Sequence, residues 1–391
     1  MDNHGIARVA RTARTEDQRR QDLDKIQRYR ELDDAIRDKT SRGAYDDPAL
    51  FPLTSKLLRL NPEYYTIWNV RRRCLTSSLL SKHPPSSSAA IPPRPASPTA
   101  GKSGTTVNVA EREPDPSADV GVLQSELAFT VPLLLEYPKC YWIWKYRKWL
   151  LEQAILRLPR SVASKVWEAE LALASKMLTK DRRNFHAWGY RRSLVARLES
   201  AALLGRSLVE DEFAYTTKMI GLDLSNFSAW HNRSRLMLRV LDERGVDDKS
   251  RATFLETELH MVQEALNVGP EDQSLWYYHR YLMSQVVGSE PGPTVAPNLK
   301  VEQRISYLEK EAEFIKDLVP DFPDTKWPYG ALVEYTFALR KLHHGATGGR
   351  EDNDPIFWLT KLRKLDAMQT GRWNDVERDI KRQLVACSNE Q

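Results

Sequence analysis

Cysteine is scarce in this chain of 391 residues. The three cysteines, Cys74, Cys140 and Cys387, are far apart and form no CxxC pair. Their odd number and wide spacing argue against a disulfide framework and against a cysteine-rich zinc site, and fit a reducing compartment. We therefore expect a cytoplasmic protein.

Long apolar runs and a strong charge imbalance are also lacking. No run approaches the ~18 to 20 apolar residues that cross a bilayer, so no transmembrane segment is expected. The N-terminus has no apolar core of a secretory signal. A net charge of +5 is too small to argue for a nucleic-acid partner.

Sequence motifs of a self-sufficient active site are missing too. The chain has no His, Cys and carboxylate cluster at metal spacing, so no metal site is expected in it. Residues 96–103 match a permissive phosphate-loop pattern. That motif works only between a strand and a helix, whereas here its flanks are proline-rich.

The chain does contain a repeated tryptophan pattern. Five copies centre on Trp68, Trp144, Trp188, Trp230 and Trp276. Three residues after the Trp, four copies carry an arginine and the fifth carries His279; the arginines are Arg71, Arg147, Arg191 and Arg233. The spacing lies in the forties, except for a longer first interval. Positions i and i+3 are neighbours on a helix, so each Trp and its Arg share a face.

Each copy predicts a helix, a short polar turn and a second helix. Ten residues before each Trp stands a leucine or isoleucine near the end of an apolar-periodic segment, and residues that begin helices follow. Two-helix units at this period indicate an all-α fold, an α-α superhelix (solenoid) of helical hairpins. We expect the Trp to wedge between the two helices of its hairpin and the Arg to brace them. His231 and His279, inside repeats, are interpreted as packed histidines bonded within a hairpin.

Three regions follow from this pattern. Residues 1–44 form a charged N-terminal segment with a helix at about 15–40, and residues 45–342 form the repeat domain. Proline and serine dominate an insertion at 83–120, which is predicted to be disordered. A sixth, degenerate unit is placed on Trp327. Residues 343–391 are read as a loop and two capping helices at about 356–385.

Two of the predicted turns depart from the repeat average. Lys139 and His186 are basic where other copies carry neutral or acidic residues, and the aromatic residues Tyr141 and Phe185 stand beside them. Side-chain charge at helix N-termini suits an anionic ligand, because unpaired N–H groups and the helix dipole add to it. The alternative is that these are ordinary solvated residues on the charged rim of a repeat protein.

The copies resemble the repeats of protein prenyltransferase α subunits over residues 45–285. The resemblance rests on stretches such as Pro138-Lys139-Cys140-Tyr141-Trp142-Ile143-Trp144 and Asn184-Phe185-His186-Ala187-Trp188. Within the family the chain looks most like the Rab (type II) geranylgeranyltransferase α subunits. Supporting details are Phe185, the Tyr190-Arg191-Arg192 ending, Ser234 and Asp272-Gln273-Ser274.

The resemblance implies one half of an enzyme. The partner would be a β subunit that holds the catalytic zinc, so no cofactor would be bound by this chain. The heterodimer would transfer geranylgeranyl from geranylgeranyl diphosphate to C-terminal cysteines of a Rab GTPase presented by an escort protein. Lys139 would offset charge on the leaving diphosphate, and His186 and Tyr141 would hydrogen-bond it, with Phe185 on the same rim.

Two other interpretations stay open at this stage. The chain resembles, less closely, the α subunit shared by farnesyltransferase and the type I geranylgeranyltransferase. Alternatively, it is a non-catalytic helical scaffold. The insertion and the position of His4, which follows Met-Asp-Asn, depart from the family pattern.

Overall fold

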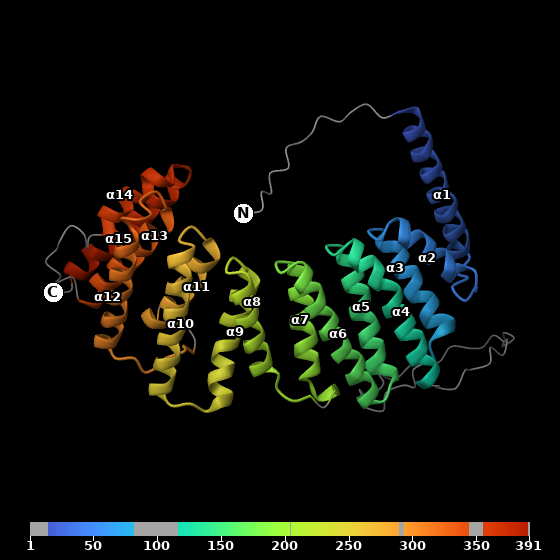
Figure 1. Cartoon of the computed structure of the whole chain (residues 1–391), viewed down its shortest axis with the longest axis horizontal. Coiled ribbons are helices and arrows are strands. Elements are labelled where there is room, and N and C mark those ends of the chain that lie inside the picture. Colours follow the sequence, from blue (N-terminus) through green and yellow to red (C-terminus); the bar gives the residue numbers. More distant parts are fainter. Residues whose placement is uncertain (1–14, 82–115, 204, 289–292, 344–354, 390–391) are drawn as a thin grey trace, which may run out of the picture. The chain divides into compact units, whose positions relative to one another are not determined.

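The described part of the computed structural model is built of helices. It comprises residues 15–81, 116–203, 205–288, 293–343 and 355–389, and these residues contain no strand (Figure 1). The all-α class predicted from the sequence is therefore confirmed. The chain divides into two compact units, Met1–Arg206 and Ser207–Gln391, a boundary that falls inside the predicted repeat domain 45–342.

The first unit is a series of helical hairpins behind a long N-terminal helix. Its helices are α1 (Glu16–Ser41), α2 (Leu50–Leu60), α3 (Tyr65–Cys74) with the π-helical turn η1 (Leu75–Leu79), α4 (Pro116–Glu136), α5 (Tyr141–Arg157), α6 (Arg160–Lys180), α7 (Phe185–Leu198) and the short η2 (Ala201–Leu203). Helices α2–α3, α4–α5 and α6–α7 form the hairpins. The helix predicted at 15–40 is α1, which contacts the first hairpin through a hydrogen bond from Tyr64 Oη to Asp33 Oδ1 (3.1 Å).

The second unit continues the same pattern. Its helices are α8 (Val209–Leu222), α9 (Phe227–Arg244), α10 (Asp248–Val268), α11 (Gln273–Val287), α12 (Val301–Leu318), α13 (Lys326–Leu342), α14 (Pro355–Leu365), η4 (Ala367–Gln369) and α15 (Thr370–Asn389). Local chemistry sets several ends. The Asp272 side chain caps α11, and Gly245 and Gly288, with positive φ of 61° and 67°, end α9 and α11. Two helices were predicted at the C-terminus, and the structure has α14 and α15 there.

Each repeated tryptophan forms a hydrogen bond to the turn that precedes its helix. Its indole Nε1 donates to the carbonyl oxygen six residues earlier, in Trp68 to Pro62 at 2.8 Å and in Trp144 to Pro138 at 2.9 Å. The same bond forms in the other three copies. The ring also packs against the next hairpin, since the Trp68 and Tyr146 centroids lie 4.7 Å apart. The prediction that the Trp packs between the two helices of its own hairpin was therefore incomplete, because the ring also contacts the next hairpin.

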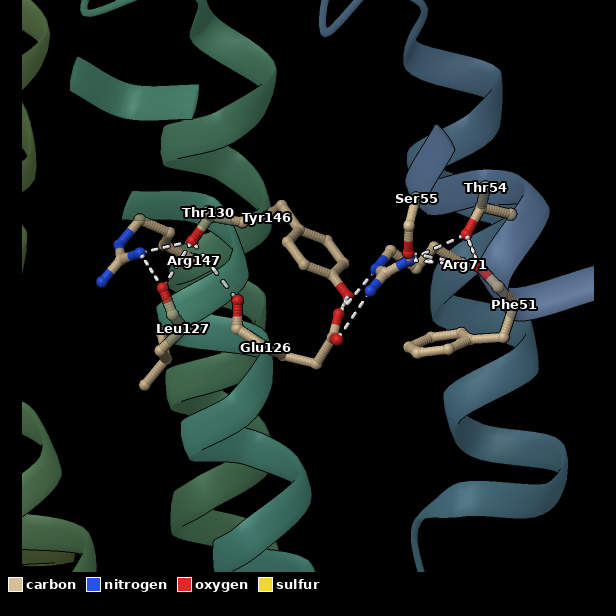
Figure 2. Close-up of polar contacts among 9 residues, drawn as sticks. All are labelled: Phe51, Thr54, Ser55, Arg71, Glu126, Leu127, Thr130, Tyr146 and Arg147. Carbon is tan, nitrogen blue, oxygen red and sulfur yellow. Dashed lines mark hydrogen bonds and ion pairs between the residues drawn. The ribbon is translucent and has the colours of Figure 1, made fainter. Parts of the chain in front are cut away.

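The repeated arginine joins two hairpins through a buried carboxylate. Figure 2 shows Arg71 of α3 held by Glu126 of α4, with Nε–Oε2 and Nη2–Oε1 distances of 2.6 and 2.7 Å. Its Nη1 donates to Thr54 Oγ1 in its own hairpin at 2.8 Å. Tyr146 Oη donates to Glu126 at 2.6 Å. The predicted brace exists, and it extends to the following repeat.

The same clamp recurs within each unit. Arg147 Nε pairs with Glu170 at 3.0 Å, and Arg233 Nε pairs with Glu258 at 2.7 Å. Arg191 donates to Ser175 in its own hairpin at 2.7 Å. The sequence reasoning missed the glutamates, although a signal existed. They stand eighteen residues before the Trp of their own repeat, at Glu126, Glu170 and Glu258.

The fifth and sixth repeats correct two sequence predictions. His279 is fully buried; its Nε2 lies 2.8 Å from Glu311 of α12 and its Nδ1 lies 2.9 Å from Tyr335 Oη of α13, so its bonds reach the next hairpin. Tyr329 Oη donates to Pro323 O, six residues earlier, at 3.0 Å. Glu311 stands eighteen residues before it. Tyr329, not Trp327, therefore occupies the Trp position of the sixth repeat.

His231 and α4 also differ from expectation. His231 is exposed, with its ring 5.9 Å from that of Phe227, so the packed interpretation was wrong. Helix α4 begins at Pro116, inside the stretch assigned to the insertion. The rest of that stretch, with the phosphate-loop-like residues 96–103, lies outside the described residues, as does most of the loop predicted at 343–355.

Helix α4 is also more apolar than the sequence reasoning allowed. By length and composition alone, residues 117–136 would suffice to cross a bilayer. In the structure, Leu123, Leu133 and Leu134 are buried, and Glu126 of the same helix takes part in the clamp with Arg71. This packing is that of a core helix in the hairpin series.

Removing the clamp carboxylate should destabilise the first unit strongly. Glu126→Ala leaves Arg71 buried without its acid and Tyr146 without its acceptor. We expect the free energy of unfolding to fall by about 3–5 kcal/mol. Urea unfolding followed by circular dichroism measures it. Glu243→Ala is the control, because Glu243 forms only a half-exposed i,i+4 pair with Arg239 and should cost about 0.5 kcal/mol. Similar losses of unfolding free energy in the two variants would contradict the stabilising role of the clamp.

Candidate functional site

The four predicted site residues lie at two neighbouring turns of the first unit. Lys139 is in the turn between α4 and α5, and Tyr141 is the first residue of α5. Phe185 and His186 are the first two residues of α7. Each therefore sits where a second helix of a hairpin begins and its first N–H groups have no intrahelical partner.

Hydrogen bonds between turns fix the spacing of these residues. The Asn184 side chain caps α7, with Oδ1 accepting from His186 N at 3.0 Å. Its Nδ2 reaches the preceding turn and donates to Pro138 O at 3.1 Å. One turn further back, Cys140 Sγ contacts Pro62 O at 3.5 Å. The turns of three successive hairpins are thus connected.

The aromatic members form a contiguous group. The Tyr141 and His186 ring centroids are 6.3 Å apart, and those of Phe185 and His186 are 4.1 Å apart. Tyr141 is 48% exposed and Phe185 66% exposed, which is unusual for large rings. The structure therefore brings together three of the predicted residues, with their rings open to a ligand or partner.

Charge around His186 comes from two turns. Burial of the imidazole lowers the pKa of His186 below its ordinary value, the Glu63 carboxylate opposes this, and the Lys139 ammonium lowers the pKa further. A histidine with a lowered pKa is neutral at pH 7, with one nitrogen donating and the other accepting. Lys139 itself is exposed.

Sequence reasoning missed three neighbours from the first repeat and α5. Glu63 stands at the repeat position of Lys139, five residues before the Trp. Tyr65, 54% exposed, has its ring centroid 5.2 Å from that of Trp142, and Trp142 lies 5.2 Å from Tyr141. The signal was present, since Tyr65 shares the aromatic repeat position of Tyr141, but spacing alone does not show which rings meet.

The chemistry of this group suits an anionic ligand. It offers a lysine ammonium, a phenol and a neutral imidazole beside two helix N-termini. Among the described residues, no three His, Cys, Asp or Glu side chains are placed to hold a metal ion. Cys74 and Cys140 are buried, and burial raises the pKa of each thiol to about 11, so neither is a ready nucleophile or metal ligand.

Comparison with known sequences identifies the repeat. Five segments match the protein prenyltransferase alpha subunit repeat, at residues 49–78, 123–154, 167–198, 209–240 and 255–286. These are the five hairpins with a repeated Trp. A geranylgeranyltransferase-I of Candida albicans, solved with GGPP, contains a chain with the same fold at a TM-score of 0.53, with 17% identity and coverage of 95% of this chain and 93% of that chain.

Relatives that match most of the chain give the same result. The geranylgeranyl transferase type-2 alpha subunit of Schizosaccharomyces pombe is 30% identical over 382 residues, 96% of this chain and 98% of the relative. That of Saccharomyces cerevisiae is 34% identical over 281 residues, 72% of each. That of Dictyostelium discoideum is 31% identical over 96% of this chain and all of its own length. The chain therefore belongs to the protein prenyltransferase α-subunit family. Within it, these relatives are type-2 α subunits.

The electrostatic arrangement predicts the direction of two pKa changes at His186. Lys139→Ala removes a positive charge and should raise the pKa of His186. Glu63→Gln removes a negative charge and should lower it. Titration of the imidazole C–H signals by NMR measures both. A shift in the same direction in both variants would contradict the placement of these charges.

Proposed function

We propose that this chain is the α subunit of a heterodimeric Rab geranylgeranyltransferase. The enzyme transfers geranylgeranyl from geranylgeranyl diphosphate to C-terminal cysteines of a Rab GTPase bound to its escort protein. The observation that carries the proposal is the group of Lys139, Tyr141 and His186 on connected turns, in a chain whose relatives are named type-2 geranylgeranyl transferase alpha subunits.

Lys139, Tyr141 and His186 act on the diphosphate. As the bond to the geranylgeranyl carbon breaks, negative charge grows on the departing diphosphate, and the Lys139 ammonium offsets it. The Tyr141 hydroxyl and the neutral His186 imidazole donate hydrogen bonds that orient the diphosphate. Phe185 shields the same rim from water. An interaction that strengthens as charge develops accelerates the reaction more than it tightens substrate binding.

The β subunit completes the site. It would hold the catalytic zinc, which would supply a site for the accepting cysteine thiolate. The exposed rings of Tyr65, Tyr141 and Phe185 are apolar surface suited to a partner. The chain is inactive without the β subunit, and the heterodimer works in the cytoplasm, a location that fits the few cysteines of this chain.

Activity of the heterodimer tests the role of Lys139. In the complex with a type-2 β subunit, Lys139→Ala should lower kcat about 100-fold, with a much smaller change in the Kd of a fluorescent geranylgeranyl diphosphate analogue. The matched control is Lys145→Ala, an exposed lysine on the same helix α5, which should leave both unchanged. Equal effects of Lys139→Ala on kcat and Kd would exclude the proposed role.

The acceptor distinguishes the enzyme class. Offered a free peptide ending in a CaaX box and a Rab bound to its escort protein, the heterodimer should prenylate the Rab alone. Prenylation of the free peptide would assign the chain to the farnesyl and type I enzymes instead. Failure to form a complex with the β subunit, seen by size-exclusion chromatography, would favour a scaffold.

A further inference from the structure

A second site is suggested by a cavity of about 550 Å³ in the unit Ser207–Gln391. It is lined by α11, α13, α14, α15 and the segment between α14 and α15, and the proposed transfer reaction uses none of its residues. Its volume lies in the range of small-molecule sites, about 300–1,000 Å³. Aromatic rings make up much of the lining, at Trp276, Tyr277, Trp327, Tyr335, Phe337 and Trp373.

The rings form an ordered apolar wall. Tyr277 and Trp327 meet edge to face, with centroids 5.9 Å apart and planes at 65°. Tyr277 remains 44% exposed. Aromatic rings in this arrangement offer both a face and an edge to a flat or aliphatic ligand.

Charges in the lining are mostly neutralised. Arg280 Nε pairs with Glu334 Oε2 at 3.0 Å, and Lys326 Nζ pairs with Asp366 Oδ1 at 3.2 Å. Asp379, the third acid, pairs with Arg382, which is outside the lining, at 3.4 Å. The third cation of the lining is Arg372, which has no carboxylate partner among the side chains that the structure describes. Its guanidinium carbon lies 4.8 Å from the centroid of the Trp373 ring.

A buried hydrogen-bond donor lies beside Arg372. The Trp373 indole Nε1 is buried and donates to no described atom. A buried donor without an acceptor costs free energy, and such groups in native structures usually have a partner. Arg372 and Trp373 are consecutive residues in the first turn of α15. The cavity wall therefore carries an exposed, solvated guanidinium beside a buried indole N–H that has no acceptor among the described atoms.

We propose that this cavity binds a small apolar carboxylate, such as an aromatic acid. The carboxylate accepts hydrogen bonds from the Arg372 guanidinium and from Trp373 Nε1, and the apolar body packs on Trp327 and Tyr277. A charged acceptor fits better than a neutral one, because hydrogen bonds between a guanidinium and a carboxylate are stronger than those between neutral groups. The site is independent of the prenyl-transfer function.

Direct binding to the full-length chain tests the proposal. Isothermal titration calorimetry compares 1-naphthaleneacetate with its carboxamide, which has the same ring and no charge. A second pair is the tripeptide Ala-Leu-Phe with a free or an amidated C-terminus. It tests whether the C-terminal carboxylate of a peptide also binds the cavity. We expect the acid of at least one pair to bind about 10-fold or more tightly than its amide. Equal affinity for acid and amide in both pairs, or no binding at millimolar ligand, would overturn the proposal.

Substitutions locate the binding. Arg372→Gln should weaken binding of the acid about 10-fold and leave the amide unaffected, and Trp373→Phe, which keeps a ring but removes the N–H, should weaken it about 3-fold. The matched control is Arg378→Gln, an exposed arginine of α15 outside the lining that pairs with Asp375. Arg372 is exposed, so its replacement should not disturb folding. Equal losses in Arg372→Gln and Arg378→Gln would overturn the assignment.

Discussion

The buried arginine–glutamate pair between consecutive hairpins is the interaction on which the rest of this structure depends. An arginine such as Arg71 and its acid Glu126 are both almost fully buried, and each would be strongly destabilising without the other. One hairpin supplies the arginine and the next supplies the acid. Within a unit, no hairpin can therefore complete its core alone. The tyrosine that adds a bond to the same carboxylate fixes the register as well.

That register positions the candidate site. Lys139 and His186 belong to successive repeats and lie 47 positions apart in the sequence. Their turns are held together by the bond from Asn184 to Pro138 O and by the packing of Trp144 against Tyr190, with ring centroids 5.0 Å apart. The buried contacts of the repeat thus hold the turns that carry the exposed residues. This rim carries the Lys139 cation and the polar groups of Tyr141 and His186 on connected turns.

Local sequence pattern predicted the hairpins because helix periodicity and turn residues are local signals. It failed where a residue's role depends on another hairpin. Glu126 and Glu170 look like surface residues of amphipathic helices, and only packing shows that they are buried beside arginines. Likewise Trp327 matched the repeat by residue type, whereas the bonds of Tyr329 and His279 show the true register.

The sequence by itself determined the all-α repeat architecture, the family, and the four residues Lys139, Tyr141, Phe185 and His186 that depart from or mark the repeat. The tertiary structure decided which of them meet, that Glu63 and Trp142 join them, and that His186 has a lowered pKa. The cavity beside Arg372 is likewise visible only in the tertiary structure. The physical reason is that burial and charge proximity arise between segments distant in sequence, whereas helix and turn propensities are written into a few adjacent residues.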